Sequence, residues 1–291
     1  MERSSSAVER APTWVRPARP GHNPAQTDRM RQVLPYDATS HDPFLMLNED
    51  WFSRTGFDWH PHRGFETVTV VLDGVLEHMD NAGGHGILRA GDVQWTTTGS
   101  GVLHTEVAHE KRAAHTLQLW LNLPARLKMS KPRYQDLRGA EAPVAQADKA
   151  LVRVFSGDVL GVKGKAENLW PATVARIEVQ AGGSVVVDVP AGWASFLYVT
   201  GGALQIGGQE AGEADVAWFE PAGQGVQAAG GNDVGKIRVS SSGGGQAVFF
   251  ASKPIREPVA AYGPFVMNTH DEIIQTVRDY QSGKFGDIPA R

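Results

Sequence analysis

Two short segments of this chain, His60-Pro61-His62 and His104-Thr105-Glu106, carry metal-competent side chains at positions i and i+2. In a β-strand these positions share one face. If both strands line one barrel, three imidazoles and a carboxylate converge on a point. Imidazole and carboxylate suit Fe, Mn, Co, Ni, Cu or Zn, whereas all-oxygen ligation would favour Mg or Ca. The spacing therefore predicts a site for one divalent transition metal.

Such a site is typical of catalysis rather than of structure. Four protein ligands on a metal that prefers six leave two positions for a substrate or for substrate and dioxygen. A structural zinc site would be closed, tetrahedral and usually rich in cysteine. The chain has no cysteine.

Glu66 competes with Glu106 for the position of fourth ligand. Alternation along the strand that follows His62 predicts that Glu66 faces inward with the ligands, while Thr67 and Thr69 take the other face. Periodicity alone does not choose between the two carboxylates. One would bind the metal, and the other would hold a ligand by a hydrogen bond.

The other histidines fit less well. His78 and His115 lie in predicted strands and could face inward, but we expect core or surface roles for both. Five aromatic residues surround the first ligands, and we expect most in the core and one or two in the wall of an aromatic substrate pocket. These five are Trp51, Phe52, Phe57, Trp59 and Phe65.

The elements that must position these residues are short strands. Turn signals such as Asp73-Gly74 and Gly99-Ser100-Gly101 recur about every 8–10 residues between positions 44 and 123, as in an all-β sandwich or barrel. The strand-like runs between them are Glu66–Leu72, Val75–Asp80, His85–Arg89, Val93–Thr98, Val102–Val107 and Thr116–Leu123.

The second half of the chain weakly repeats the first. The matching pairs are Val71–Leu76 with Val199–Leu204, Gly91–Trp95 with Ala214–Trp218, and Gly99–Val102 with Gly223–Val226. These offsets place Asp188, Pro190, Ala228 and Gly230 where His60, His62, His104 and Glu106 stand. No histidine occurs between His115 and His270, so we expect a second barrel without metal.

Composition excludes several classes of function. The 291 residues carry a net charge of -4 and no dense Lys/Arg cluster, which argues against direct nucleic-acid binding. The polar N-terminus lacks a signal-peptide pattern, and no apolar run approaches the roughly 20 residues of a membrane span. With no cysteine, the chain suits a reducing compartment. We expect a cytoplasmic monomer that does not bind membranes.

The end of the chain predicts one helix at about 270–282. Thr269 to Glu272 fits a capping box, and Gly283 would end the helix. Its apolar stripe would comprise Ile273, Ile274, Val277 and Tyr280. The expected organisation is an irregular segment at 1–40, a metal-binding barrel at 41–125, a linker at 126–150, a metal-free barrel at 151–255, and a C-terminal extension at 256–291.

Several motifs together resemble the pirin family of the cupin superfamily. They are Phe57–Thr69, Gly91–Trp95, His104–Glu106, Leu117–Pro124 and Gly263–Thr269. The resemblance covers about 42–285, and the first 36 residues depart from it. It implies an all-β fold of two tandem cupin (jelly-roll) β-barrels with a short C-terminal helix. It also implies metal, usually iron, in the N-terminal barrel alone, with His60, His62, His104 and Glu106 as ligands and Glu66 as a pocket residue.

The resemblance further implies an Fe(II)-dependent dioxygenase similar to quercetin 2,3-dioxygenase, with one iron per chain and Mn, Ni, Co, Cu or Zn as substitutes. The substrates would be dioxygen and a small aromatic molecule such as a flavonol, opened at C2–C3 with loss of carbon monoxide. Glu106 or Glu66 would accept the substrate proton. The alternative implied by the family is a metal- or redox-responsive regulator that binds a protein partner, such as a transcription factor or a metabolic enzyme.

Overall fold

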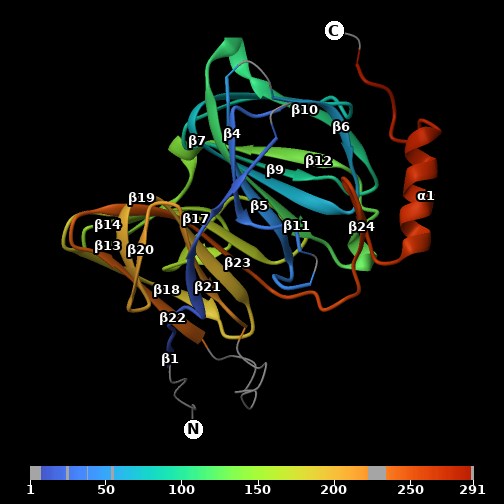
Figure 1. Cartoon of the computed structure of the whole chain (residues 1–291). Coiled ribbons are helices and arrows are strands. Elements are labelled where there is room, and N and C mark those ends of the chain that lie inside the picture. The colour runs from blue at the N-terminus through green and yellow to red at the C-terminus, as the bar shows by residue number, and fades with distance from the viewer. Residues whose placement is uncertain (1–7, 24–25, 38, 54–55, 222–233, 290–291) are drawn as a thin grey trace. The chain divides into compact units, whose positions relative to one another are not determined.

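A computed structural model describes residues 8–23, 26–37, 39–53, 56–221 and 234–289. Most of these residues lie in β-strands, which form two compact units, each built around one large and mainly antiparallel sheet (Figure 1). The first unit, called here the histidine unit, comprises residues 19–141 and 255–291 and holds every histidine of the chain. The other, called the histidine-free unit, comprises residues 1–18 and 142–254. The all-β prediction is confirmed.

Strand β7 organises the histidine unit. Its first half pairs with β9 and β11, and its second half pairs with β8 and β10, so this one long strand belongs to two walls of the barrel. The bounds are β3 (Arg19–Gly21), β4 (Arg29–Leu34), β5 (Phe44–Phe52), β6 (Gly56–His62), β7 (Phe65–Asp80), β8 (His85–Arg89), β9 (Val93–Thr97), β10 (Val102–Ala108), β11 (Ala114–Asn122), β12 (Arg133–Leu137), β24 (Ala260–Tyr262) and β25 (Phe265–Met267).

The histidine-free unit repeats this pairing order around β19, which pairs with β20, β21, β22 and β23, while β22 pairs with β18. Part of the compared repeat, Gly223–Val226 with Ala228 and Gly230, lies outside the described residues. The bounds are β1 (Val8–Glu9), β2 (Trp14–Pro17), β13 (Val144–Ala147), β14 (Ala150–Ser156), β15 (Asp158–Val159), β16 (Val162–Lys163), β17 (Ala172–Val179), β18 (Gly183–Pro190), β19 (Ala194–Ile206), β20 (Gln209–Gly212), β21 (Asp215–Phe219), β22 (Val234–Ser241) and β23 (Gly245–Ser252).

Two segments predicted to be irregular contain strands instead. Within 1–40, β2 pairs with β21 of the histidine-free unit, and β4 pairs with β5 of the histidine unit. Within the expected linker at 126–150, β12 extends one sheet by pairing with β9, and β13 pairs with β14. Added strands of this kind gain their hydrogen bonds from a partner strand and need little hydrophobic alternation of their own, so periodicity does not reveal them.

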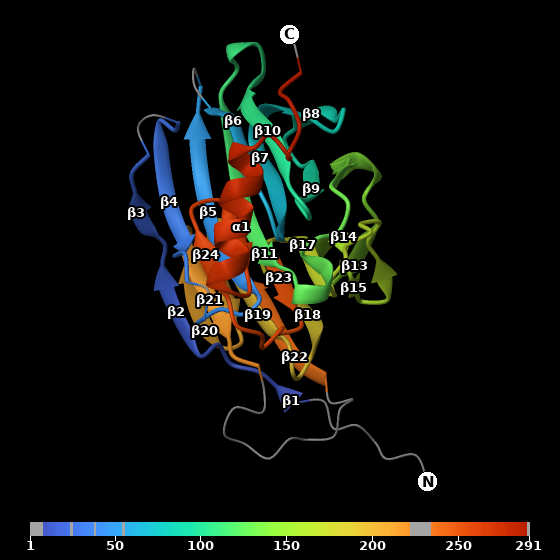
Figure 2. The same cartoon turned by 90° about the vertical axis from the view of Figure 1, so that its right-hand side faces the viewer.

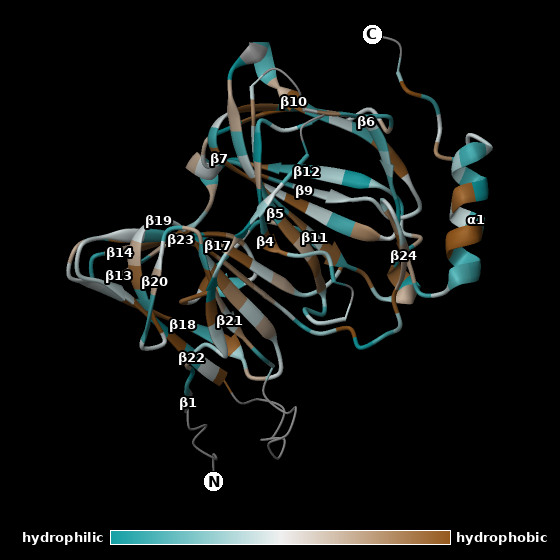
Figure 3. Ribbon diagram, viewed as in Figure 1, coloured by the Kyte–Doolittle hydropathy of each residue, from teal (hydrophilic) through white to brown (hydrophobic). Residues whose placement is uncertain are grey.

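The predicted helix is present as α1 (His270–Gln281), the one α-helix among the described residues. Thr269 and Glu272 form the expected capping box. Figures 1 and 2 both show α1 beside β24, and it contacts β24 and β25. Figure 3 shows its brown apolar segments between teal polar ones. Within the part of the chain that the structure describes, no helix is long and apolar enough to cross a membrane.

The apolar stripe of α1 differs from the predicted one. Ile273, Thr276 and Asp279 are buried, whereas Ile274 and Tyr280 are 48% and 41% exposed. The helix turns this mixed face inward because a buried arginine of the barrel lies beneath it and needs polar partners.

Candidate metal centre

Strand β10 lies between β6 and β7 and brings the predicted ligand segments together. His104 stands opposite His60 on β6, and Glu106 stands opposite His78 on β7. Cross-strand neighbours on one face are close enough for their side chains to meet. One donor atom from each of His60, His62 and His104 lies within 4.8 Å of the other two. The structure thus gathers the three imidazoles that the sequence pattern predicted.

Burial keeps these imidazoles uncharged. His62 and His104 are fully buried, and burial, together with neighbouring imidazoles, holds the pKa of each well below its usual value of 6.5. Burial also lowers the pKa of His60. The Nδ1 of His60 lies 2.6 Å from the carbonyl oxygen of Asp58, so Nδ1–H donates there and Nε2 is available to a metal. Neutral imidazole is the form that binds metal.

Glu106 is the carboxylate beside His104, and one donor atom from each of Glu106, His104 and the buried His78 lies within 4.8 Å of the other two. Glu106 is 2% exposed, and its two oxygens accept hydrogen bonds from Thr69 Oγ1 at 3.1 Å and Gln118 Nε2 at 2.6 Å. Gln118 is itself fixed because its Oε1 accepts from Trp120 Nε1 at 3.2 Å. A carboxylate offers about four lone-pair sites, so two accepted bonds leave capacity for a metal. Three neutral imidazoles and this oxygen donor fit a divalent transition metal.

Glu66 lies elsewhere, and the parity prediction that placed it on the ligand face is wrong. Arg63 and Gly64, the latter with φ 94°, form a turn between β6 and β7, so the alternation restarts at Phe65. Phe65 lies 5.2 Å from His62 between ring centroids. Thr69 contacts Glu106, so the odd-numbered positions face the site. Glu66 points to the opposite face and accepts from Thr97 Oγ1 at 2.7 Å.

Aromatic rings stand beside the imidazoles. The Trp120 ring lies 5.1 Å from His62 and 4.4 Å from Phe65, and Tyr36 meets Trp120 edge-on at 6.2 Å. Of the five aromatic residues considered from sequence, Phe65 is in this wall. Trp59 packs instead with residues of the C-terminal extension. Trp120 was missed because its orientation depends on the pairing of β11 with β7, which the sequence does not show.

Asp50 is a second buried carboxyl group that sequence analysis missed. It is 2% exposed, and no hydrogen-bond partner reaches its Oδ1 among the described residues. Burial, together with the charges of Glu106 and Glu49, raises the pKa of Asp50 to about 7. The barrel interior near the site therefore holds two buried carboxyl groups, Glu106 and Asp50.

Two buried basic side chains hold the turn that follows His62, and burial lowers the pKa of one of them, Lys128, to about 7. Arg63 donates to Asp279 Oδ2 at 2.9 Å and to Thr276 Oγ1 at 3.2 Å, which fastens α1 to the turn. Lys128 is 1% exposed. Its Nζ donates to three oxygens, namely Gly64 O at 2.8 Å, Asn122 Oδ1 at 2.6 Å and Val266 O at 3.1 Å. These contacts limit the freedom of the neighbouring ligand.

The comparisons with known proteins agree with this geometry. Residues 16–121 match the Pirin family model, and residues 174–286 match the model of the Pirin C-terminal cupin domain. Human Pirin is 38% identical over 84% of this chain and 83% of its own length. A Pseudomonas aeruginosa protein whose name proposes a quercetin 2,3-dioxygenase is 38% identical over 88% of this chain and 91% of its own.

Among solved structures, the quercetin 2,3-dioxygenase from Acinetobacter baumannii superposes with a TM-score of 0.85 at 28% identity, over 97% of this chain and 100% of that one. The fold is that of a protein with two tandem cupin barrels, as the resemblance implied. Within that class, the chain belongs to the pirin family.

Proposed function

We propose that this pirin is an iron(II)-dependent dioxygenase that opens flavonols such as quercetin at C2–C3 and releases carbon monoxide. The observation that carries the proposal is the cluster of three imidazoles, with His62 and His104 buried and His60 partly buried, near the carboxylate of Glu106. The similarity to proteins named as quercetin 2,3-dioxygenases supports the choice of substrate.

The metal would be held by His60, His62, His104 and Glu106. When bound, a divalent cation supplies a Lewis acid that lowers the pKa of a 3-hydroxyl group placed next to a 4-carbonyl. The residues of the chain then need to accept one proton from the substrate, to hold its rings in one plane, and to exclude water from them.

Glu106 is the proton acceptor in this proposal. Thr69 and Gln118 hold one oxygen each, so the carboxylate has a defined direction before substrate arrives. Pre-set direction matters because a general base must lie within hydrogen-bond reach of the proton that it takes. Glu66 is directed to the opposite face of β7, so we assign the proton transfer to Glu106 alone.

Trp120 is partly buried, packs against the fully buried Phe65, and is positioned to hold a planar aromatic substrate. Their rings contact each other and His62, and the indole N–H of Trp120 is bound by Gln118. Aromatic faces stack on flat rings and exclude water. A flavonol that coordinates through its 3-hydroxyl would thus lie against this wall.

The test is turnover by protein loaded with iron(II) under anaerobic conditions and then mixed with quercetin and dioxygen. We expect loss of the flavonol absorbance with release of one carbon monoxide per substrate. Glu106→Gln should lower turnover about 100-fold or more, since general base catalysis contributes on that scale. His115→Gln, on the outer side of the sheet against Trp51, is the matched control and should keep activity. Absence of turnover with iron, manganese, nickel, cobalt and copper would overturn the proposal.

The regulatory alternative stays a prediction. It is tested by pull-down with ferrous and ferric protein, where a protein partner that depends on the oxidation state, without flavonol turnover, would favour it.

A further inference from the structure

A row of polar side chains crosses the large sheet of the histidine unit, and each member stands opposite the next on the neighbouring strand. From β12 to β5 the row consists of Asp136, Gln94, Thr69, Gln118 and Asn48. Directly opposite residues share one face of a sheet. Thr69 and Gln118 both donate to Glu106, so the face that they share with Asn48 is the face of the candidate metal centre.

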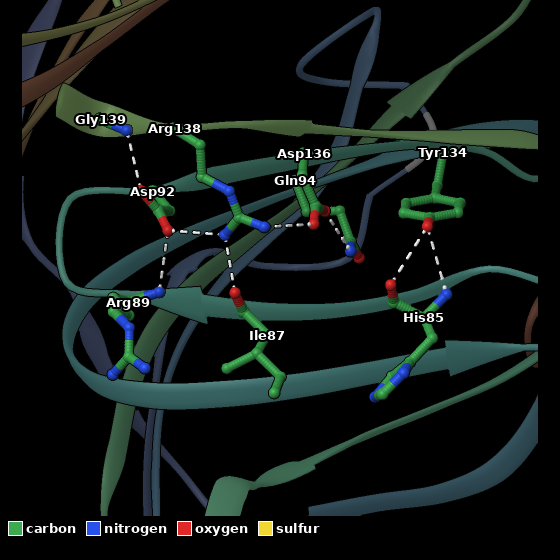
Figure 4. A network of polar contacts seen from close by, with 9 residues as sticks. All are labelled: His85, Ile87, Arg89, Asp92, Gln94, Tyr134, Asp136, Arg138 and Gly139. Carbon is green, nitrogen blue, oxygen red and sulfur yellow. Dashed lines mark hydrogen bonds and ion pairs between the residues drawn. The ribbon is translucent and has the colours of Figure 1, made fainter. Parts of the chain in front are cut away.

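At the β12 end of the row, the polar side chains are paired within the protein. Figure 4 shows Gln94 Nε2 donating to Asp136 Oδ1 at 3.0 Å, while Arg138 donates to the other oxygen of Asp136 at 3.0 Å. In the same view, the hydroxyl of Tyr134 bonds to the backbone N and O of His85 at 3.2 and 3.3 Å. These contacts satisfy the polar groups of this end without a ligand.

Strand β5, at the other end of the row, carries a buried oxygen that is not satisfied in this way. Asp50 follows Asn48 by two residues, so both side chains take the same face of the strand. Asp50 is 2% exposed, and its Oδ1 has no hydrogen-bond partner among the described residues. Buried polar atoms are almost always paired. This oxygen therefore calls for a donor from outside the chain, and the hydroxyl group of a ligand is such a donor.

The neighbours of Asn48 indicate which part of a ligand reaches it. Met46, two residues before Asn48, stands opposite Trp120, so this face of β5 changes from apolar beside the aromatic wall to polar beyond it. Met46 and Asn48 are both partly exposed. Neighbouring strands lie about 4.8 Å apart. Asn48 is thus one strand spacing from Gln118, which holds Glu106, and a ring next to the metal-bound part of a ligand spans that distance.

We propose that Asn48 and Asp50 determine substrate specificity by binding hydroxyl groups on the ring of the substrate that lies away from its metal-binding oxygens. Asp50 Oδ1 accepts a hydrogen bond from one hydroxyl, and the amide of Asn48 bonds to the adjacent one. An analogue without these hydroxyls leaves Asp50 buried and unpaired, and a site built to pair a hydroxyl rejects such an analogue strongly. This assignment rests on the proposed flavonol activity and adds the choice among flavonols.

Binding of two flavonols to zinc-loaded protein tests the assignment without turnover. Quercetin carries two adjacent hydroxyls on the ring attached at C2, and galangin is the same molecule without these two. Under anaerobic conditions, the change in flavonol absorbance on binding gives the dissociation constant of each. We expect the wild type to bind quercetin about 25-fold more tightly than galangin, which is about fivefold for each of two hydrogen bonds.

Two replacements of similar size remove these hydrogen bonds one at a time. Asn48→Leu and Asp50→Leu should each weaken the binding of quercetin about fivefold and leave that of galangin unchanged, and the double variant should bind both flavonols alike. Met46→Leu is the matched control, because it changes the neighbouring side chain on the same face without removing a polar group. It should keep the preference of the wild type.

The outcomes separate this assignment from the proposed function. Equal affinity of the wild type for the two flavonols would overturn the assignment, and so would variants that weaken both flavonols to the same extent. If Asp50→Leu does not fold, Asn48→Leu still decides, because its effect must fall on quercetin alone. A zinc-loaded wild type that binds neither flavonol would refute the proposed substrate class and the assignment together. Selective binding without turnover by the iron-loaded protein would support the assignment and refute only the dioxygenase activity.

Discussion

The two units share a strand-pairing order but differ in what they bury. Among the described residues, every buried histidine and every buried charged side chain lies in the histidine unit, including Asp50, Glu106 and Lys128. The buried polar side chains of the histidine-free unit are all hydroxyls: Ser156, Thr173, Ser195, Ser241 and Ser252. One framework of strands therefore accepts either interior, and the chemistry follows from the side chains alone.

The contrast is sharpest between two equivalent strand pairs. In β6 and β10 the facing residues are His60 and His104. In β18 and β22 they are Val187 and Ile237, which belong to a continuous apolar core. Asp188, aligned with His60 in the sequence repeat, is exposed, so it does not occupy the position of a ligand. Strand β18 thus pairs as β6 does, but a shift of one residue in its register turns Val187 inward and Asp188 outward.

The largest effect is expected from removing His104, the imidazole that belongs to both donor clusters. His104→Ala should reduce bound metal from about one ion per chain to less than about a tenth, because the proposed site then keeps only two of its three imidazoles. Metal analysis of protein purified without added metal measures this. His115→Ala should leave the content unchanged. Full metal content in His104→Ala would show that the histidine unit does not hold its metal here.

The second prediction concerns a carboxyl group placed in the apolar core of the histidine-free unit. Ile237→Glu buries a carboxyl group among valines with no donor nearby, and should lower the free energy of unfolding by about 4 kcal/mol. Urea unfolding measures the change. Ile237→Val, which removes one methylene, should cost about 1 kcal/mol. Equal stability of the two variants would mean that the apolar core tolerates charge as the histidine unit does.

The third prediction concerns a buried basic side chain of the histidine unit. Lys128→Met leaves Gly64 O, Asn122 Oδ1 and Val266 O without their donor, and should lower the free energy of unfolding by about 2 kcal/mol. The exposed Lys131→Met provides the control in the same urea titration. A stable Lys128→Met would indicate that the burial cost of the charge offsets its three hydrogen bonds.

The smallest effect is a gain in stability that depends on pH. The pKa of Asp50 is about 7 in the folded protein against 3.8 for the ordinary group, so between these values the folded state binds more protons than the unfolded state. Stability of the metal-free wild type therefore falls as pH rises from about 4 to about 7. Asp50→Asn removes this loss and should be more stable by roughly 1–2 kcal/mol at pH 8, with little difference near pH 4.

Denaturant midpoints of the two metal-free proteins across this range measure the effect, and the exposed Asp73→Asn serves as control. A constant difference at all pH values would show that Asp50 does not change protonation on folding.

Local spacing was enough to predict part of the site. His60 with His62, and His104 with Glu106, are i, i+2 pairs, so each pair shares a face whatever surrounds it. The all-β class and the capped helix α1 were also predictable from turn signals and a capping box. The two-barrel architecture followed from the family resemblance.

Residues whose place depends on distant pairing were not predictable. His78 meets Glu106 only through the register of β7 with β10. Glu66 was misplaced because the turn at Arg63 and Gly64 shifts the parity by one residue, which reverses every side chain after it. The strands of the first 40 residues were not predictable either, because they form by hydrogen bonding to strands far along the chain, as β2 does to β21 and β4 to β5.

The contact of Arg63 with Asp279 also bears on the order in which the protein is made. Synthesis reaches α1 only after every strand of both units. A growing chain that ends before residue 270 already contains all the proposed metal donors, yet Arg63 lacks Asp279 and Thr276. The barrel can begin to fold on the ribosome, since folding proceeds from the N-terminus as the chain emerges. The turn beside His62 is fastened to α1 only when the chain has passed residue 279, so the fully supported metal centre belongs to the completed protein and not to its nascent forms.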